Sequence, residues 1–571
     1  MITLRQNTSN MKVFKYIYKH FAIILLLLFF LKPYSFAQIP IPKYEARAVW
    51  LTTIGGLDWP HSYARTEHSA DIQKKEFCDI LDKLKAANIN TVLLQTRIRG
   101  TVIYPSVYEP WDGCLSGVPG LSPGYDALEF AIEECHKRGM ELHAWIVTIP
   151  VGKWNKTGCK RLRQKYPYLI KKIGDEGYID PELPAAASYL AGICREVTES
   201  YDVDGIHLDY IRYPETWNKK IYREQGRKYI TSIVQRIHDT VKSIKPWVKI
   251  SCSPIGKFDD LTRYDSHGWN AYSRVCQDAQ GWLQAGLMDE LFPMLYFKGN
   301  QFYPFALDWK EYSYGRIICA GLGVYFMSDK EKDWSIDLFK RKMNVLRANG
   351  MGHAFFRSDF FTKNIKGLYD FTADEMNAHP ALIPPMTWQW AVKPLAPSTL
   401  EIFASENGDY IRWSGAKDLS DGPYLCYNVY ASPKYPVDIN DARNIIATRH
   451  TKQDLFVARG TKSRPIHYAV TAMDRYGNES APTNLTPQTA QDNTFHFLKN
   501  DGKTLSVPKK TNVMSADYLI IETLQGSIIA TRPYIDETTD ISNIPEGMYI
   551  LRSLNKKGVT HRLGIFTIKR R

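Results

Sequence analysis

Several kinds of chemistry have no signature in this chain of 571 residues. No HExxH pair of zinc-binding histidines and no glycine-rich phosphate loop is present. The nine cysteines include no CxxC pair, and those at positions 135, 194, 252 and 319 fall on expected core helices and strands. We therefore interpret the cysteines as small buried hydrophobic residues, with one or two disulfides left open, and we expect neither a metal nor another cofactor.

Long hydrophobic runs are also scarce. The run from Phe21 to Leu31 is too short for a comfortable transmembrane helix. Three lysines precede it, and Ser35-Phe36-Ala37 supplies small residues suited to a cleavage site. We expect a signal peptide over residues 1–37, with an uncleaved anchor as the alternative. The mature protein is then exported to the periplasm, cell envelope or exterior, without stable membrane insertion.

The charge has no clustered motif of the nucleic-acid-binding kind. Removing residues 1–37, which hold five basic residues and no acidic one, lowers the formal net charge from +13 to +8. A modest positive charge favours solubility and attraction to an anionic cell envelope. We expect no nucleic-acid partner, and the sequence does not indicate an oligomeric state.

What the chain does have, from Glu45 to about Asp370, is an alternation of apolar strands with amphipathic helices. Helical patterns such as KKEFCDILDKLKAAN lie between the strands. The expected strands are Arg47–Thr53, Asn90–Thr96, Met140–Thr148, Gly205–Arg212, Val248–Ser253, Glu290–Phe297, Ile317–Tyr325 and His353–Ser358. Eight such repeats predict an α/β fold, a (β/α)8 TIM barrel over residues 45–378, with its site at the carboxyl ends of the strands.

Two all-β segments are expected after a proline-rich linker at 379–397. Residues 394–488 resemble a fibronectin type III domain, with an inward Trp413 and a corner-type tyrosine in the segment Tyr468–Ser480. Residues 494–571 form a second small β domain. Its Pro545–Leu551 segment and the Gly558 hairpin resemble the C-terminal sorting domains of type IX secretion, and a plain accessory sandwich stays open as the alternative.

The most informative stretch is YDVDGIHLDYIRYP, from Tyr201 to Pro214. In a strand, side chains alternate between two faces. Ile206, Leu208 and Tyr210 would then face the surrounding helices, and His207 and Asp209 would face the barrel interior. An inward carboxylate is costly to bury unless it is paired or lies at a site, and this one ends its strand.

Other strands bring polar and aromatic groups to the same end of the barrel. These are Gln95, Arg97, His143, Trp145, Tyr296, Arg357 and Asp359. The long loop from Arg99 to Gly117 adds Tyr104 and Trp111 beside acidic residues, a combination that suits sugar rings. So many converging groups predict a ligand pocket.

At this point the residues match a known family. EARAVWLTTIGGLDWP, the LLQTRIRG segment and its continuation to ECHKRGMELHAW, and VDGIHLDYIRYP resemble the glycosyl-hydrolase-like 10 family. The resemblance implies a glycoside hydrolase, with peptidoglycan glycan strands lacking stem peptides as the substrate of one branch. The chain departs from the family pattern at Ile146–Pro150 and at Pro293–Phe297.

Glycoside hydrolysis requires two carboxyl groups. By analogy with related barrels, Asp209 is the nucleophile or base, with His207 and Arg212 holding it ionised. Asp359 is favoured as its partner, and Asp58, Glu109, Asp112 and Glu215 stay open. The expected substrate-binding residues are Arg97, Tyr104, Trp111, His143, Trp145, His207, Arg212 and Tyr296. We expect an exported hydrolase acting on a polysaccharide, and the alternative is a catalytically inactive glycan-binding protein.

Overall fold

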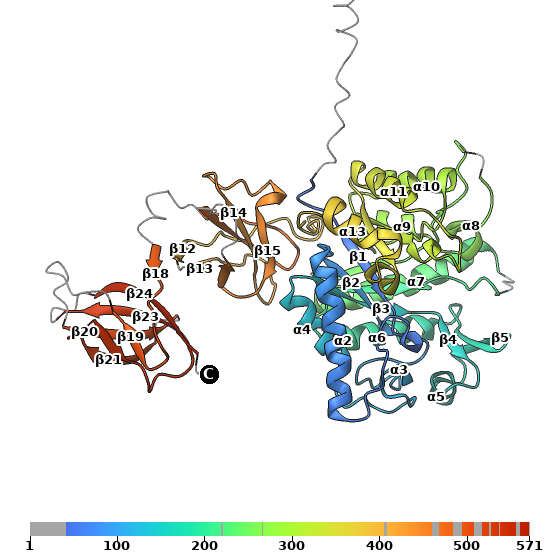
Figure 1. Cartoon of the computed structure of the whole chain (residues 1–571). Coiled ribbons are helices and arrows are strands. Elements are labelled where there is room, and N and C mark those ends of the chain that lie inside the picture. Colours follow the sequence, from blue (N-terminus) through green and yellow to red (C-terminus); the bar gives the residue numbers. More distant parts are fainter. Residues whose placement is uncertain are drawn as a thin grey trace, which may run out of the picture. The chain divides into compact units, whose positions relative to one another are not determined.

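A computed structural model gives the structure of the chain (Figure 1). The residues that it describes are 41–217, 221–264, 266–404, 408–458, 467–483, 494–507, 517–524, 527–535, 537–555 and 560–569. The expected signal peptide and Gly558 lie outside these ranges. No helix within them is long and apolar enough to cross a membrane.

The first part of the described chain is a closed barrel of eight parallel strands, in the order β1-β11-β10-β9-β8-β7-β3-β2. The strands are β1 Arg47–Leu51, β2 Thr91–Arg97, β3 Glu141–Val147, β7 Gly205–Asp209, β8 Lys249–Cys252, β9 Glu290–Leu291, β10 Ile317–Gly323 and β11 Gly352–Phe356. Each coincides with one of the eight predicted strands. The predicted TIM barrel is confirmed.

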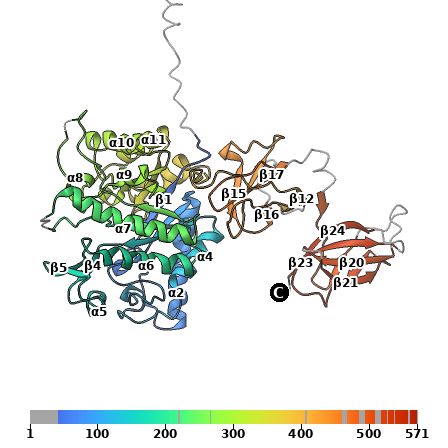
Figure 2. The same cartoon turned by 180° about the vertical axis from the view of Figure 1, so that it is seen from behind.

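Helices cover the outside of the barrel, and α6 and α7 lie side by side there (Figure 2). Their bounds are α2 Glu67–Ala86, α4 Ala127–Lys137, α6 Pro184–Ser200, α7 Arg223–Ile244, α8 Ala271–Val275, α9 Ala279–Gln284, α10 Tyr303–Glu311 and α11 Ile336–Ala348. Side-chain caps start several of them. The hydroxyl of Thr66 accepts a hydrogen bond from the backbone N–H of Ser69, and the Asp126 carboxylate caps α4.

The strand alternation divides the apolar residues between two cores. Outward residues such as Leu94, Ile206 and Leu208 pack against the helices in one large buried cluster. Inward residues such as Trp50 and Trp145 form a second cluster inside the barrel. The inward positions of β7 are therefore those of His207 and Asp209, as the pattern predicts.

Two long excursions extend the carboxyl end of the barrel. The loop after β2 contains the short helix α3 Gly113–Ser116. The segment after β3 forms a small antiparallel sheet in the order β4-β6-β5, which the sequence pattern did not predict. Its elements are β4 Pro150–Lys153, α5 Thr157–Lys165, β5 Ile170–Ile173 and β6 Glu176–Ile179. After β11, α12 Ser358–Thr362 and α13 Leu368–Asp370 return the chain along the barrel.

The remaining strands form small sheets outside the barrel, which are antiparallel except where β12 pairs with β18 in parallel. One four-stranded sheet, β16-β13-β12-β18, and one three-stranded sheet, β15-β14-β17, share a buried cluster around Trp413. A further four-stranded sheet, β21-β20-β23-β24, and the pair β19-β22 share another. The strands are β12 Thr399–Ala404, β13 Gly408–Ser414, β14 Cys426–Ser432, β15 Ile445–His450, β16 Asp454–Ala458, β17 His467–Met473, β18 Thr494–His496, β19 Thr504–Ser506, β20 Tyr518–Thr523, β21 Ile528–Pro533, β22 Thr538–Asp540, β23 Gly547–Leu554 and β24 Thr560–Ile568.

All nine cysteines lie within the described ranges and all are free thiols. Eight are buried and Cys78 is half-buried. The disulfides that the sequence left open are absent from these nine residues. The interpretation of the cysteines as small core residues is confirmed.

Candidate active site at the carboxyl end of the barrel

Asp209, the last residue of β7, is held by residues at the carboxyl ends of the two neighbouring strands β3 and β8 and by the backbone that follows it. Its Oδ1 accepts hydrogen bonds from the Ser253 hydroxyl and the Tyr210 backbone N–H, both at 2.8 Å. Its Oδ2 accepts one from the indole Nε1 of Trp145 at 3.2 Å. Burial raises the pKa of Asp209, and these donors together with Arg212 only partly oppose that rise. The carboxyl group is thus fixed in position and disposed to retain a proton.

The residues that follow Asp209 turn sharply. Tyr210 has a left-handed backbone, with φ of 53°, which ends the strand. Its ring packs against the inner cluster of the barrel, so the prediction that Tyr210 faces the helices is wrong. The buried Arg212 guanidinium lies 4.1 Å from the centre of that ring, and its Nη1 is 2.7 Å from Oε1 of Glu215. A cation and an aromatic face therefore stand next to the Asp209 carboxyl.

Half-buried aromatic rings gather at the ends of β9, β10 and β11. The Tyr296 and Phe356 rings are 5.9 Å apart, and Tyr325 lies 6.0 Å from each of them. A β-carbon on Gly323 would come within 3.2 Å of both tyrosine rings, so glycine leaves room for them. Exposed aromatic edges and faces of this kind suit the C–H surfaces of a sugar.

The two carboxylates at the ends of β1 and β11 differ in access. Asp58 is buried and accepts hydrogen bonds from the backbone N–H and hydroxyl of Thr52, at 2.7 and 2.6 Å. It also accepts one from the Asp359 backbone N–H at 2.9 Å and pairs with Arg357. Asp359 is half-buried and pairs with Lys363 at 2.7 Å. Asp58 therefore ties the two strand ends together, and Asp359 keeps accessible surface.

Two of the expected binding residues, Arg97 at the end of β2 and Tyr104 in the loop that follows, are buried. Arg97 forms a bidentate pair with Glu109, and its Nη1 donates to the backbone oxygen of Thr148 at 2.9 Å. The Tyr104 hydroxyl donates to Glu196 at 2.9 Å. Neither side chain offers surface to a ligand, and both hold the excursions in place. Trp111, by contrast, is half-buried.

Both histidines lie deep inside the barrel. His143 Nε2 is 3.1 Å from Oε2 of Glu141, near the amino ends of the strands. His207 bonds the Ser251 hydroxyl at 3.0 Å and accepts from Trp50 at 3.3 Å. Burial, with a smaller contribution from His143, holds the pKa of His207 well below its ordinary value. His207 is therefore neutral and no partner of Asp209, which corrects the expectation that it keeps Asp209 ionised.

Three residues of the site were not predicted from the sequence. Ser253 belonged to a predicted strand but was not singled out, although it is a polar residue at a strand's carboxyl end. Tyr325 and Phe356 also lie at predicted strand ends, and the barrel register brings them beside Tyr296. The sequence feature that could have identified them is an inward-facing position at the carboxyl end of a predicted strand.

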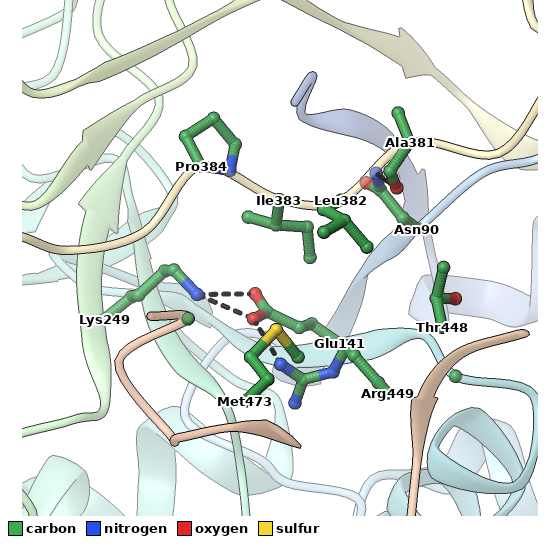
Figure 3. A pocket seen from close by; sticks show the side chains of 12 residues that line it. Asn90, Glu141, Lys249, Ala381, Leu382, Ile383, Pro384, Thr448, Arg449 and Met473 are labelled. Atoms are coloured by element: carbon green, nitrogen blue, oxygen red, sulfur yellow. Dashed lines mark hydrogen bonds and ion pairs between the residues drawn. The ribbon is translucent and has the colours of Figure 1, made fainter. Parts of the chain in front are cut away.

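At the opposite, amino-terminal end of the barrel, buried ion pairs surround a small cavity (Figure 3). Lys249 Nζ lies 2.7 and 2.8 Å from the two carboxylate oxygens of Glu141. Arg449, from β15, reaches the same carboxylate at 3.0 Å. The cavity volume is about 10 Å³, which holds at most one water molecule. A cavity of this size has no room for a sugar ring.

Comparison with known proteins finds similarity between the barrel and glycosyl hydrolases. Residues 45–314 match the model of the family described as glycosyl hydrolase-like 10. The chain is also similar to proteins named glycosyl hydrolases. YngK of Bacillus subtilis (strain 168) is 28% identical over 481 residues, which are 77% of this chain and 93% of YngK. DigH of Escherichia coli (strain K12) is 32% identical over 285 residues, which are 44% of this chain and 65% of DigH.

Among solved structures, the glycoside hydrolase domain of PgaB (BpsB) from Bordetella bronchiseptica is 13% identical, with a TM-score of 0.41. The match covers 58% of this chain and 98% of that domain. So slight a likeness adds nothing to the barrel topology described above.

Proposed function

We propose that this protein is an exported glycoside hydrolase of the glycosyl hydrolase-like 10 family that cleaves a polysaccharide, with peptidoglycan glycan strands as the first candidate. The observation that carries the proposal is the Asp209 carboxyl, fixed by Trp145 and Ser253 at the mouth of a TIM barrel whose relatives are named glycosyl hydrolases. Arg212 and the half-buried rings of Tyr296 and Tyr325 supply a surface for sugar.

We assign Asp209 the role of general acid. Burial raises the pKa of this carboxyl group, which favours the protonated form that a general acid needs before the leaving oxygen takes the proton. This assignment differs from the nucleophile or base that the analogy with related barrels suggests. The second carboxyl group is Asp359 in this proposal, because it keeps accessible surface where Asp58 is fully engaged.

Hydrolysis then requires a base or nucleophile on the other side of the bond. Asp359 would act on water or on the anomeric carbon, and the separation of the two carboxyl groups in the complex decides inversion or retention. Of the other open candidates, Glu215 is exposed and pairs with Arg212, whereas the Asp112 carboxylate caps α3 by accepting from the Cys114 backbone N–H.

The test incubates the purified protein with denuded peptidoglycan, intact sacculi and plant glucans. Asp209→Asn and Asp359→Asn are compared with Asp337→Asn, a control on the outer helix α11. We expect soluble saccharides from the wild type and the control, and a loss of at least about 100-fold in Asp209→Asn. Binding without products in every variant would favour the alternative, an inactive glycan-binding barrel.

A further inference from the structure

A hollow lies at the carboxyl end of the barrel, between the two excursions that follow β2 and β3. Its volume is about 320 Å³, and it is lined by residues 106–111 of the β2 loop and by Arg161 and Lys165 of α5. Both segments follow the carboxyl ends of their strands, β2 and β3. The hollow is therefore on the face where a glycan bound at Asp209 would extend.

The charge around this hollow is predominantly positive. Residues 153–172 contain eight basic residues and no acidic one. The acidic residue in the lining, Glu109, is neutralised by Arg97 at 2.6 Å and accepts from the Tyr189 hydroxyl at 2.7 Å. The two exposed cations, Arg161 and Lys165, are thus left without an acidic counterpart in the lining.

Arg161 and Lys165 differ in their hydrogen bonding. Lys165 Nζ donates to the Val107 backbone oxygen at 3.0 Å, which directs it over the hollow's edge. Arg161 lies against Gly120 and makes no hydrogen bond or ion pair with any residue in the described ranges. A guanidinium in this state retains its full capacity for bidentate binding of a carboxylate.

Aromatic surface accompanies the charge. Tyr108 and Trp111 both line the hollow and both are half-buried. The Tyr108 ring packs edge-on against Tyr189 at 6.0 Å, and the Trp111 backbone oxygen accepts from Gly120 at 2.8 Å. The Tyr108 ring and the Trp111 backbone are held in this way, so the loop offers preformed aromatic surface to a sugar.

The hollow is also linked to the carboxyl group at the barrel mouth. Arg97, which holds Glu109, donates to the Thr148 backbone oxygen at 2.9 Å. The Thr148 hydroxyl in turn donates to the Asp209 backbone oxygen at 2.8 Å. Two successive hydrogen-bonded contacts therefore fix the wall of the hollow relative to Asp209.

We propose that this hollow is a binding subsite for an anionic saccharide unit, with a sugar carboxylate on Arg161 and Lys165 and the ring against Trp111. The subsite deepens the proposed function and rests on it for the identity of the chain that binds. It selects glycans whose units carry a carboxylate, such as the lactyl carboxylate of peptidoglycan strands without stem peptides.

The test measures binding of the full chain carrying Asp209→Asn to two soluble probes by calorimetry. One probe is a glycan of alternating N-acetylglucosamine and N-acetylmuramic acid, and the other is the same glycan with its carboxylates reduced to alcohols. Arg161→Ala/Lys165→Ala is compared with Lys228→Ala/Arg236→Ala, which removes two exposed cations from α7.

We expect the hollow variant to bind the carboxylated glycan roughly tenfold more weakly than the control, as one charge-assisted hydrogen bond contributes about that factor. The reduced glycan should bind both variants equally. Equal affinity of the two variants for the carboxylated glycan, or undiminished binding of the reduced glycan to the parent, would overturn the subsite. If the wild type binds through this hollow but releases no saccharide, the proposed hydrolase activity is refuted and the subsite is not.

Discussion

Arg449 of β15 forms buried ion pairs with two carboxylates at the amino-terminal end of the barrel. Its removal should therefore lower the free energy of unfolding. Opposite Asn428, strand β15 has an irregular register, and Arg449 adopts a left-handed φ of 51° there. Its guanidinium reaches Glu141 at 3.0 Å and Asp204 at 2.5 Å, and all three side chains are buried. Arg449→Ala would leave two buried carboxylates short of a cation.

The structure sets the size of the expected loss. Breaking a buried pair by removing one partner typically costs about 3–5 kcal/mol. Glu141 retains Lys249 at 2.7 Å, and Asp204 retains His136 at 2.8 Å and Arg475 at 3.2 Å. These remaining partners place the expected decrease in the free energy of unfolding near the lower end, about 3 kcal/mol.

Acid should diminish this difference. Burial alone would raise the pKa of Glu141, but Lys249 and Arg449 outweigh it and lower the pKa to about 2. For Asp204, burial is likewise outweighed by Arg449 and His136, which hold its pKa well below the ordinary range. A lowered folded-state pKa stabilises the fold above the unfolded-state value of about 4 and loses that effect as the pH falls toward 2.

The assay is urea unfolding followed by tryptophan fluorescence at pH 7 and at pH 3.5. Arg443→Ala is the matched control, since Arg443 pairs with Asp441 at 2.6 Å but is exposed, and we expect it to leave the free energy of unfolding almost unchanged. The Arg449→Ala deficit should be about 3 kcal/mol at pH 7 and smaller at pH 3.5. A deficit equal to that of Arg443→Ala, or one that grows on acidification, would refute the reasoning.

Three further substitutions test the other end of the barrel. Ser253→Ala removes a hydroxyl that lowers the pKa of Asp209. If Asp209 is the general acid, the alkaline limb of the kcat/KM profile should move to higher pH. Movement of the acidic limb instead would make Asp209 the base. Asp58→Asn should lower the free energy of unfolding by about 2–3 kcal/mol, because it leaves the Arg357 cation without its carboxylate; urea unfolding checks this, and an unchanged midpoint would contradict it. Gly323→Val should push apart the Tyr296 and Tyr325 rings and so raise the KM for the glycan. It should also lower the free energy of unfolding by about 1–3 kcal/mol. A variant with the wild-type KM would show that these rings do not bind sugar.

The barrel was predictable because each of its strands is a buried apolar run between amphipathic helices. All eight strands form where the alternation indicates, from β1 at Arg47–Leu51 to β11 at Gly352–Phe356. The sheet β4-β6-β5 was not predictable in this way. Its strands have only four residues each, and sequences such as IKKI and EGYI carry too few apolar residues to display a period.

The local backbone limited the prediction at the end of β7. Alternation applies only while the chain remains extended, and Tyr210 leaves that conformation with φ of 53°. Its ring therefore turns from the helix-facing side to the inner cluster. Nothing in the letters DYIRYP identifies a left-handed tyrosine, because this conformation is rare for residues other than glycine, asparagine and aspartate.

Depth within the barrel explains the remaining differences at the site. Alternation identifies inward side chains but does not say at which level they lie, since successive inward residues of one strand are two residues apart along the barrel axis. His143 and Trp145 both point inward from β3, yet His143 contacts Glu141 at the base and Trp145 contacts Asp209 at the mouth. An inward residue late in a strand is therefore a better candidate for chemistry than an earlier one, and this favours Asp209 and Trp145 over the two histidines.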